Sequence, residues 1–184
     1  MTEKIILGID PGTIHLGYAI IKIVKTNVEI ICVGTVHLNK LENQQLKLAK
    51  IFERISMLID EYKPDECAVE CPFYGENVQS MLKLGRAQGV AMVAALHKGI
   101  PVEEYYPKRV KQSITGNGNA SKEQVAAMLH ATLKMPAIPI SLDATDALAV
   151  AMCHYHSSIS IIGAGTKKFS GWKDFVNQKV DKKK

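Results

Sequence analysis

The sequence contains no run of about 18 or more apolar residues, so it predicts no membrane-spanning helix. A secretory signal is also lacking, because the short apolar run at residues 5–9 leads into Asp10 rather than into a small-residue cleavage site. We therefore expect a cytoplasmic protein. Internal repeats are absent as well, which argues against a fold built from two related lobes.

Cysteine is scarce, and its four copies do not form the close CxxC pairs of a zinc or redox motif. Cys153, followed by His154 and His156, could offer soft ligands to a zinc ion. We prefer the interpretation that Cys32, Cys67, Cys71 and Cys153 are free thiols in a reducing compartment, several of them buried.

Most of the chain has no excess of either charge. Residues 1–166 carry as many acidic as basic residues, and the net charge of +5 comes from residues 167–184, where seven lysines accompany two aspartates. A basic tail suits a polyanionic partner, but it can equally be a solvated terminus that binds nothing. With 184 residues, the chain is predicted to form one domain over residues 1–157 and a flexible basic tail over residues 158–184.

The hydrophobic pattern predicts a single α/β sheet with helices packed on it. Short links favour an antiparallel arrangement of the first three strands, and a connecting helix favours a fourth strand parallel to the first. A capping box at Ser121 marks a helix start, and two prolines mark a linker at residues 136–140. The expected strands are 4–10, 16–24, 28–37, 66–70 and 101–106; the other expected helices are 44–62, 78–98 and 142–156.

Four acidic residues stand at the ends of these elements. Asp10 and Glu70 close the first and fourth strands, while Asp143 and Asp146 lie on one side of the last helix near its start. If the two strands are adjacent and parallel, both carboxylates emerge at the sheet edge where α/β proteins build sites. Simpler interpretations exist: Asp143 could be a helix-start charge, and Asp10 could form a turn.

Four carboxylates held together would repel one another, and a divalent cation is the usual relief. Oxygen ligands favour hard ions such as Mg²⁺ or Mn²⁺ over zinc. Two such ions can activate a water molecule and stabilise the leaving oxygen of a phosphodiester. The pattern therefore indicates metal-assisted hydrolysis of a phosphate ester.

Several short motifs, in order and with sensible spacing over residues 4–155, point to a known family. They are Gly8-Ile-Asp-Pro-Gly-Thr with Gly17-Tyr, Ala68-Val-Glu70 followed by Phe73, Leu84-Gly-Arg-Ala-Gln-Gly-Val-Ala, Val110-Lys-Gln112 with Gly116-x-Gly118, and Asp143-Ala-Thr-Asp146-Ala-Leu-Ala. Each motif alone is weak, but together they resemble the RuvC family of Holliday-junction resolvases.

The resemblance implies an RNase H-like fold, with a five-stranded mixed sheet flanked by helices. It implies a homodimeric endonuclease that resolves four-way DNA junctions by paired symmetric nicks, using two Mg²⁺ ions per active site, with Mn²⁺ as a substitute. The family's catalytic metal ligands correspond to Asp10, Glu70, Asp143 and Asp146. The implied partners are the RuvA junction-binding protein and the RuvB branch-migration motor.

The resemblance also implies residues that contact DNA. Phe73 would stack on a base near the crossover and Tyr74 would offer a second face, while Lys111 and Lys122 would lie near the scissile phosphate. Core packing for Phe73 and simple surface charge for the lysines are the alternatives, and Lys108 and Arg109 are weaker candidates. Small residues in the helix at 78–98 suggest part of a dimer interface or packing on the chain's own sheet. Cys71 stands where the family often has Gln.

Other classes of protein fit the sequence less well. Gly-Ile-Asp-Pro-Gly-Thr also resembles the first phosphate loop of actin-like ATPases, but those need a second lobe for which 184 residues leave no room. A nuclease of the same fold acting on RNA is a further alternative, although such proteins are usually shorter. A non-catalytic junction-binding module is disfavoured because all four carboxylates are present.

Overall fold

The strands and helices of the computed structural model follow the predicted order, with one additional helix. The structure describes residues 3–72, 77–133, 135 and 141–163. Within them the elements are β1 (Glu3–Asp10), β2 (His15–Val24), β3 (Asn27–His37), α1 (Gln44–Tyr62), β4 (Glu66–Glu70), α2 (Val78–His97), β5 (Val102–Tyr105), α3 (Pro107–Thr115), α4 (Lys122–Thr132) and α5 (Leu142–Gly163).

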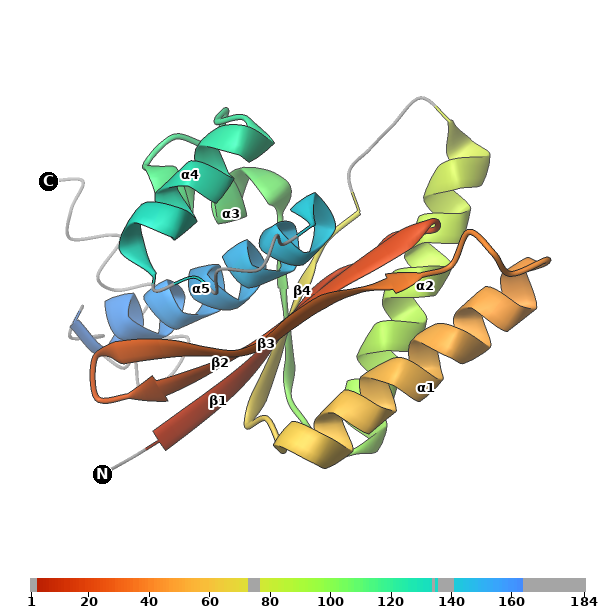
Figure 1. Ribbon diagram of the computed structural model, residues 1–184, viewed down its shortest axis with the longest axis horizontal. Coiled ribbons are helices and arrows are strands. Elements are labelled where there is room, and N and C mark those ends of the chain that lie inside the picture. Colours follow the sequence, from red (N-terminus) through yellow and green to blue (C-terminus); the bar gives the residue numbers. More distant parts are fainter. Residues whose placement is uncertain (1–2, 73–76, 134, 136–140, 164–184) are drawn as a thin grey trace, which may run out of the picture.

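The five strands form one mixed sheet in the order β3-β2-β1-β4-β5 (Figure 1). The first three strands are antiparallel neighbours, while β4 runs parallel to β1 and β5 runs parallel to β4. This topology confirms the predicted five-stranded mixed sheet. It also places β1, the strand that ends in Asp10, at the centre of the sheet.

Helices cover both faces of the sheet (Figure 1). Leu7 and Ile9 of β1 pack with α1 and α2 on one face, whereas Ile6 packs with α5 and the outer helices α3 and α4 on the other. Because both faces are covered, the centre of β1 is a continuous apolar run rather than an alternating one.

Local signals set most helix ends. Asn43 accepts a hydrogen bond from the Leu46 amide at the start of α1, and Lys63 adopts a left-handed conformation (φ 49°) just before Pro64 at its end. The capping box of Ser121 and Gln124 is present at the start of α4, as predicted.

Two helices differ from the prediction. Helix α3, which begins at Pro107 and ends at Gly116 in a left-handed conformation, was not expected. Only Val110 and the partly buried Ile114 pack on the core, and two apolar residues are too short a pattern to indicate a helix. Helix α5 extends to Gly163, seven residues beyond the predicted end, because no Gly or Pro interrupts residues 142–162.

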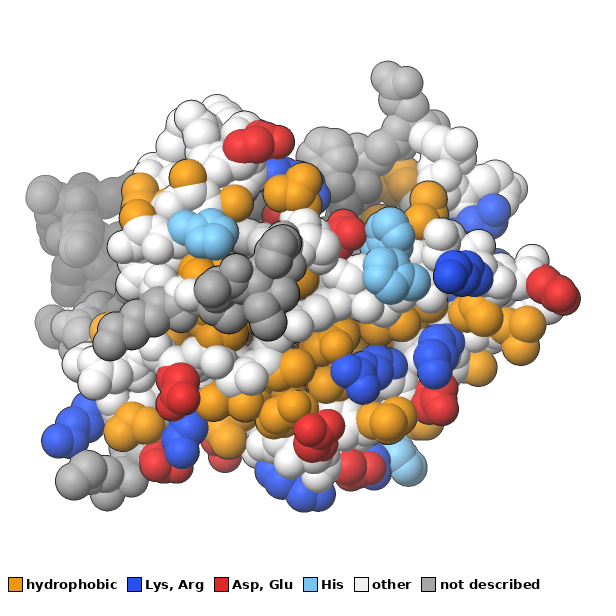
Figure 2. Space-filling model, viewed as in Figure 1, with side chains coloured by type: hydrophobic (Ala, Val, Ile, Leu, Met, Phe, Trp, Pro, Cys, Tyr) orange, Lys and Arg blue, Asp and Glu red, His pale blue; other side chains and the backbone are white. Residues whose placement is uncertain are grey.

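The described part of the chain offers no helix long and apolar enough to cross a membrane. All four cysteines are free, and burial raises the pKa of the Cys67 thiol to about 12. His154 and His156 form hydrogen bonds with Glu66 and Ser113, respectively. Acidic and basic side chains are interspersed over the face that Figure 2 shows.

Candidate active site

The sheet brings two of the four candidate carboxylates to the same edge. Asp10 and Glu70 are the last residues of β1 and β4, and the parallel register pairs Ile9 with Val69 just before them. Both side chains are therefore carried by neighbouring strands that end together. Asp10 also lies opposite Gly17 in the antiparallel pair of β1 and β2.

Two glycines let α5 lie directly on this part of the sheet. A Cβ atom on Gly17 would overlap the Asp143 carbonyl oxygen, and one on Gly8 would overlap the Ala147 carbonyl oxygen. The backbone of α5 therefore contacts β1 and β2 more closely than any other side chain would allow. This contact carries Asp143 and Asp146 to the edge where Asp10 and Glu70 stand.

A hydrogen bond from β3 helps to hold the start of α5. The Ser141 hydroxyl lies 2.5 Å from the Thr35 hydroxyl and accepts a hydrogen bond from the Ala144 amide at 3.2 Å. Ser141 thus satisfies an otherwise unpaired amide of the first turn while linking the helix to the sheet. The position of Asp143, two residues further on, depends on this link.

The four carboxylates influence one another electrostatically. The pKa of Asp10 is raised to about 8, first by burial and then by the charges of Glu70, Asp146 and Asp143. Burial, followed by the charge of Asp146, raises the pKa of Glu70 to about 7. Burial also raises the pKa of Asp146, although its ion pair with Lys122 opposes the shift. These residues form one acidic cluster, which we call the carboxylate cluster.

Basic side chains lie around the carboxylate cluster. Lys122, the first residue of α4, pairs with Asp146, and His15 Nδ1 lies 3.3 Å from Asp143 Oδ2. The charge of Lys111 on α3 opposes the raised pKa values of Glu70 and Asp146. Lys108 and Arg109 are exposed on the same helix. Phe73 and Tyr74 lie outside the described residues.

His15 is a neighbour of the cluster that was not predicted. It begins β2, and its ring meets that of His37 edge-on with 5.1 Å between the centroids. A signal existed in the sequence, because a short turn after Asp10 brings the start of the next strand back to the same edge. A single histidine at a strand start was too weak a pattern to single out.

The chemistry of the donor set fits a hard divalent cation. Every candidate ligand is a carboxylate oxygen. The raised pKa values of Asp10 and Glu70 reflect burial first and then the charges of neighbouring carboxylates, and a bound cation would favour the charged forms against both effects. Among the described residues, no three His, Cys, Asp or Glu side chains already stand at metal-binding geometry. Asp146 and Asp143 instead contact Lys122 and His15.

A mixed five-stranded sheet of this topology, flanked by helices, defines an RNase H-like protein. Residues 6–154 match the family model described as "Crossover junction endodeoxyribonuclease RuvC". A protein of that name from Cytophaga hutchinsonii is 56% identical to the chain over 99% of the chain and 89% of its own length. Another, from Porphyromonas gingivalis, is 53% identical over 98% of the chain and 97% of its own length. The chain belongs to the RuvC family.

Solved structures agree with this assignment. The structure of Thermus thermophilus RuvC in complex with Holliday junction substrate is 32% identical, with a TM-score of 0.77 over 84% of this chain and 94% of that one. The yeast mitochondrial Holliday junction resolvase Ydc2 is 14% identical, with a TM-score of 0.65 over 86% of this chain and 80% of that one, and it shares the fold.

Proposed function

We propose that this protein is a Holliday junction resolvase, which binds a four-way DNA junction and hydrolyses one phosphodiester bond in each of two opposed strands. The observation that carries the proposal is the carboxylate cluster, built from β1, β4 and α5 at one sheet edge. Family membership and the junction-bound relative support DNA rather than RNA or ATP as the substrate.

Asp10, Glu70, Asp143 and Asp146 would hold two Mg²⁺ ions, with Mn²⁺ as a substitute. Such ions supply a nucleophilic hydroxide and stabilise the charge on the leaving oxygen. The protein contributes oxygen ligands on three rigid elements, with Asp10 and Glu70 largely buried so that their positions are well defined.

Lys111 and Lys122 are suited to contact the phosphate backbone at the cut. Lys122 stands in the first turn of α4, where unpaired amide groups and the helix dipole also attract phosphate. Its side chain already reaches Asp146, so its ammonium group is within the range of a phosphate bound at the cluster. Phe73 and Tyr74 would stack on bases at the crossover, with about 1–3 kcal/mol per stacked base.

Helix α2 offers a surface for a homodimer. Its exposed apolar residues Val78, Leu82, Val93 and Leu96 share one stripe with Gly85 and Gly89, and a Cβ atom on either glycine would meet nothing within 4 Å. Ala87 and Ala91, by contrast, are buried against the chain's own core. A second copy on this stripe would provide two active sites for two strands. RuvA and RuvB are the proposed partners in branch migration.

The test uses a synthetic four-way junction and a linear duplex of the same sequence, each with and without Mg²⁺. We expect paired symmetric nicks in the junction only, and only with Mg²⁺. Cutting of the duplex at an equal rate would contradict junction selectivity. Cutting of a structured RNA, or ATP hydrolysis without junction cutting, would instead favour one of the alternative functions.

A further inference from the structure

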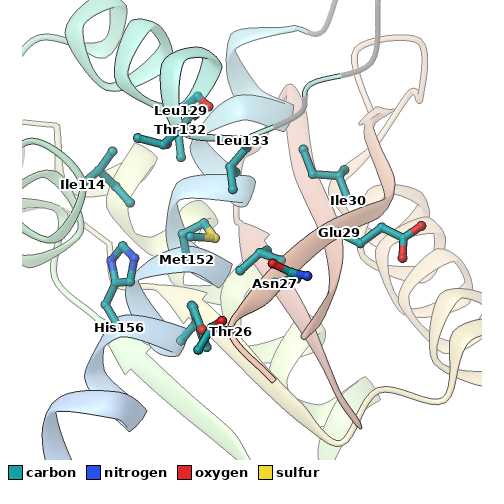
Figure 3. A pocket seen from close by; sticks show the side chains of 12 residues that line it. Thr26, Asn27, Glu29, Ile30, Ile114, Leu129, Thr132, Leu133, Met152 and His156 are labelled. Carbon is teal, nitrogen blue, oxygen red and sulfur yellow. Dashed lines mark hydrogen bonds between the residues drawn. The ribbon is translucent and has the colours of Figure 1, made fainter. Parts of the chain in front are cut away.

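A cavity of about 860 Å³ lies away from the carboxylate cluster, between the β2–β3 hairpin and helices α3, α4 and α5. Figure 3 shows Ile114 of α3, Leu133 at the end of α4 and Met152 of α5 around this space. Val28 and Ile30 of β3 line the opposite side. We call this cavity the hairpin groove. None of its lining residues takes part in the proposed reaction.

The hairpin groove is an open edge of the hydrophobic core. Val28, Ile30, Ile114 and Leu133 pack against the core cluster of α5, yet the described residues bury each of them only partly. The polar residues Thr26, Asn27, Glu29 and Thr132 are exposed at its rim. An apolar floor with a polar rim is typical of a surface that another segment covers.

The chain itself contains a segment of suitable chemistry. Residues 164–184 follow the end of α5 and include Trp172, the only tryptophan of the chain, together with Phe169 and Phe175, two of its four phenylalanines. These residues and Val176 recur at intervals of three and four, the pattern of a single apolar face. Such a concentration of aromatic residues is unexpected in a segment that serves only as a basic tail.

The length of the segment allows it to reach the groove. Tyr155, which lines the groove, precedes Gly163 by eight residues, a rise of about 12 Å along α5. Phe169 comes six positions after Gly163, and these six steps can span about 20 Å when the chain is extended. A chain that turns back after α5 can therefore bring Phe169 to the groove of the same molecule.

We infer that residues 164–184 fold back and dock Phe169, Trp172 and Phe175 into the hairpin groove, closing the open edge of the core. The lysines of the segment then remain in solvent at the rim, where Glu29 provides an opposite charge. This inference does not depend on the proposed nuclease activity.

Trp172 is a built-in reporter for the test, because no other tryptophan contributes to the fluorescence. In the full-length protein we expect a short-wavelength emission maximum and protection from acrylamide quenching. Ile30→Asp in the groove should shift the emission to longer wavelength and remove the protection. Leu46→Asp, at an exposed apolar position on α1, is the matched control and should change neither. Solvent-exposed Trp172 emission in the unmodified protein would overturn the inference.

Variants in the segment itself cover the case in which Ile30→Asp fails to fold. Phe169→Asp with Phe175→Asp leaves the groove residues intact, and we expect faster hydrogen exchange at residues 26–30 and 129–133. Unchanged exchange there would contradict docking. A dilution series identifies the occupant: emission that does not change with concentration supports docking within one chain. A shift to longer wavelength on dilution would place the segment in a second copy and overturn the intrachain arrangement.

Discussion

At the scale of single residues, Gly8 and Gly17 have the clearest effect on the site. Both belong to the first sequence motif, and both stand where the backbone of α5 meets the sheet. Their contribution is to leave room: each removes a Cβ atom that would overlap a carbonyl oxygen of α5. Asp10 of the motif supplies a carboxylate to the site, and the two glycines of the motif let α5 bring two more.

Gly17→Ala tests this contribution. The added methyl group would push the first turn of α5 and Asp143 away from Asp10, so we expect about 1–3 kcal/mol of destabilisation and slower junction cutting. Chemical denaturation and a cutting assay measure the two effects. Gly85→Ala is the control for folding stability, because its Cβ would meet nothing within 4 Å and alanine favours a helix. Equal stability of the two variants would contradict the close approach of α5.

Asp146→Asn tests the carboxylate cluster. The variant removes one negative charge from the proposed metal site, and we expect cutting to fall by at least about 100-fold while junction binding is retained. Folding stability should not fall, because the charge of Asp146 raises the pKa of both Asp10 and Glu70. Asp60→Asn, which alters an exposed ion pair with Lys98, is the matched control and should cut normally. Activity that survives Asp146→Asn would contradict the assignment.

At the scale of elements, a hydrogen-bonded chain ties α5 to two strands. Glu66 Oε2 of β4 lies 2.6 Å from Lys4 Nζ of β1 and 2.5 Å from His154 Nε2 of α5. The carboxylate accepts from Nε2, and Nδ1 of the same ring lies 2.8 Å from the Tyr105 hydroxyl at the end of β5. Four elements are thus linked, and α5 is held near its middle as well as at its start.

The Glu66 contacts predict a pH dependence of stability. Burial raises the pKa of Glu66, but the hydrogen bonds from Lys4 and His154 outweigh it, so the net pKa lies below the ordinary value. A carboxyl group whose pKa is lower in the folded state than in the unfolded state stabilises the fold at pH values above the unfolded-state pKa. This contribution is lost as the pH falls through the lower, folded-state pKa. Glu66→Gln should therefore cost about 1 kcal/mol at neutral pH and less at about pH 3, which lies below the ordinary pKa of the carboxyl group. Denaturation curves at both pH values measure the difference, and an equal cost at both would contradict it.

The secondary structure shows where local sequence is informative. Capping at Ser121 and the apolar stripe of α1 predicted those helices, because both signals lie within a few residues. Helix α3 escaped prediction because it lies on α5 rather than on the sheet and buries only Val110. The extra length of α5 was missed for a related reason: residues 157–163 lack a strong periodic pattern and are helical as a continuation of a buried helix.

At the scale of the whole molecule, the arrangement of charge suggests two separate DNA contacts. The body is neutral in sum, but two divalent cations bound at the carboxylate cluster would offset its four negative charges, beside Lys111 and Lys122. The lysines of residues 167–184 would form the second contact, which we expect to be accessory.

Replacing Lys179, Lys182, Lys183 and Lys184 with glutamine tests the accessory contact and leaves the aromatic residues of the segment in place. We expect modestly weaker junction binding. The slope of the logarithm of the binding constant against the logarithm of the salt concentration should become shallower by about 0.9 for each lost phosphate contact. The cutting rate at saturating protein should not change. Binding titrations at several salt concentrations measure the effect, and abolished cutting by a folded variant would show that the tail has a larger part.

In the proposed homodimer, paired cutting would need both subunits. Leu82→Asp places a charge in the exposed stripe of α2, and we expect a monomer that nicks single strands instead of resolving junctions. Met57→Asp, at a comparably exposed position on α1, is the matched control and should remain dimeric. Analytical ultracentrifugation distinguishes the two states. A dimeric Leu82→Asp variant would place the interface elsewhere.

The sequence by itself determined the order of the strands and main helices, the four carboxylates and the family motifs, because hydrophobic period, capping residues and short motifs are local properties of the chain. Tertiary structure alone decided how these parts meet. Close approach of α5 over Gly8 and Gly17, the contact of His15 with Asp143, the outward-facing stripe of α2 and the hairpin groove all arise between residues far apart in the chain. Such contacts depend on how the covered faces of the sheet pack in three dimensions, and no local pattern specifies that packing.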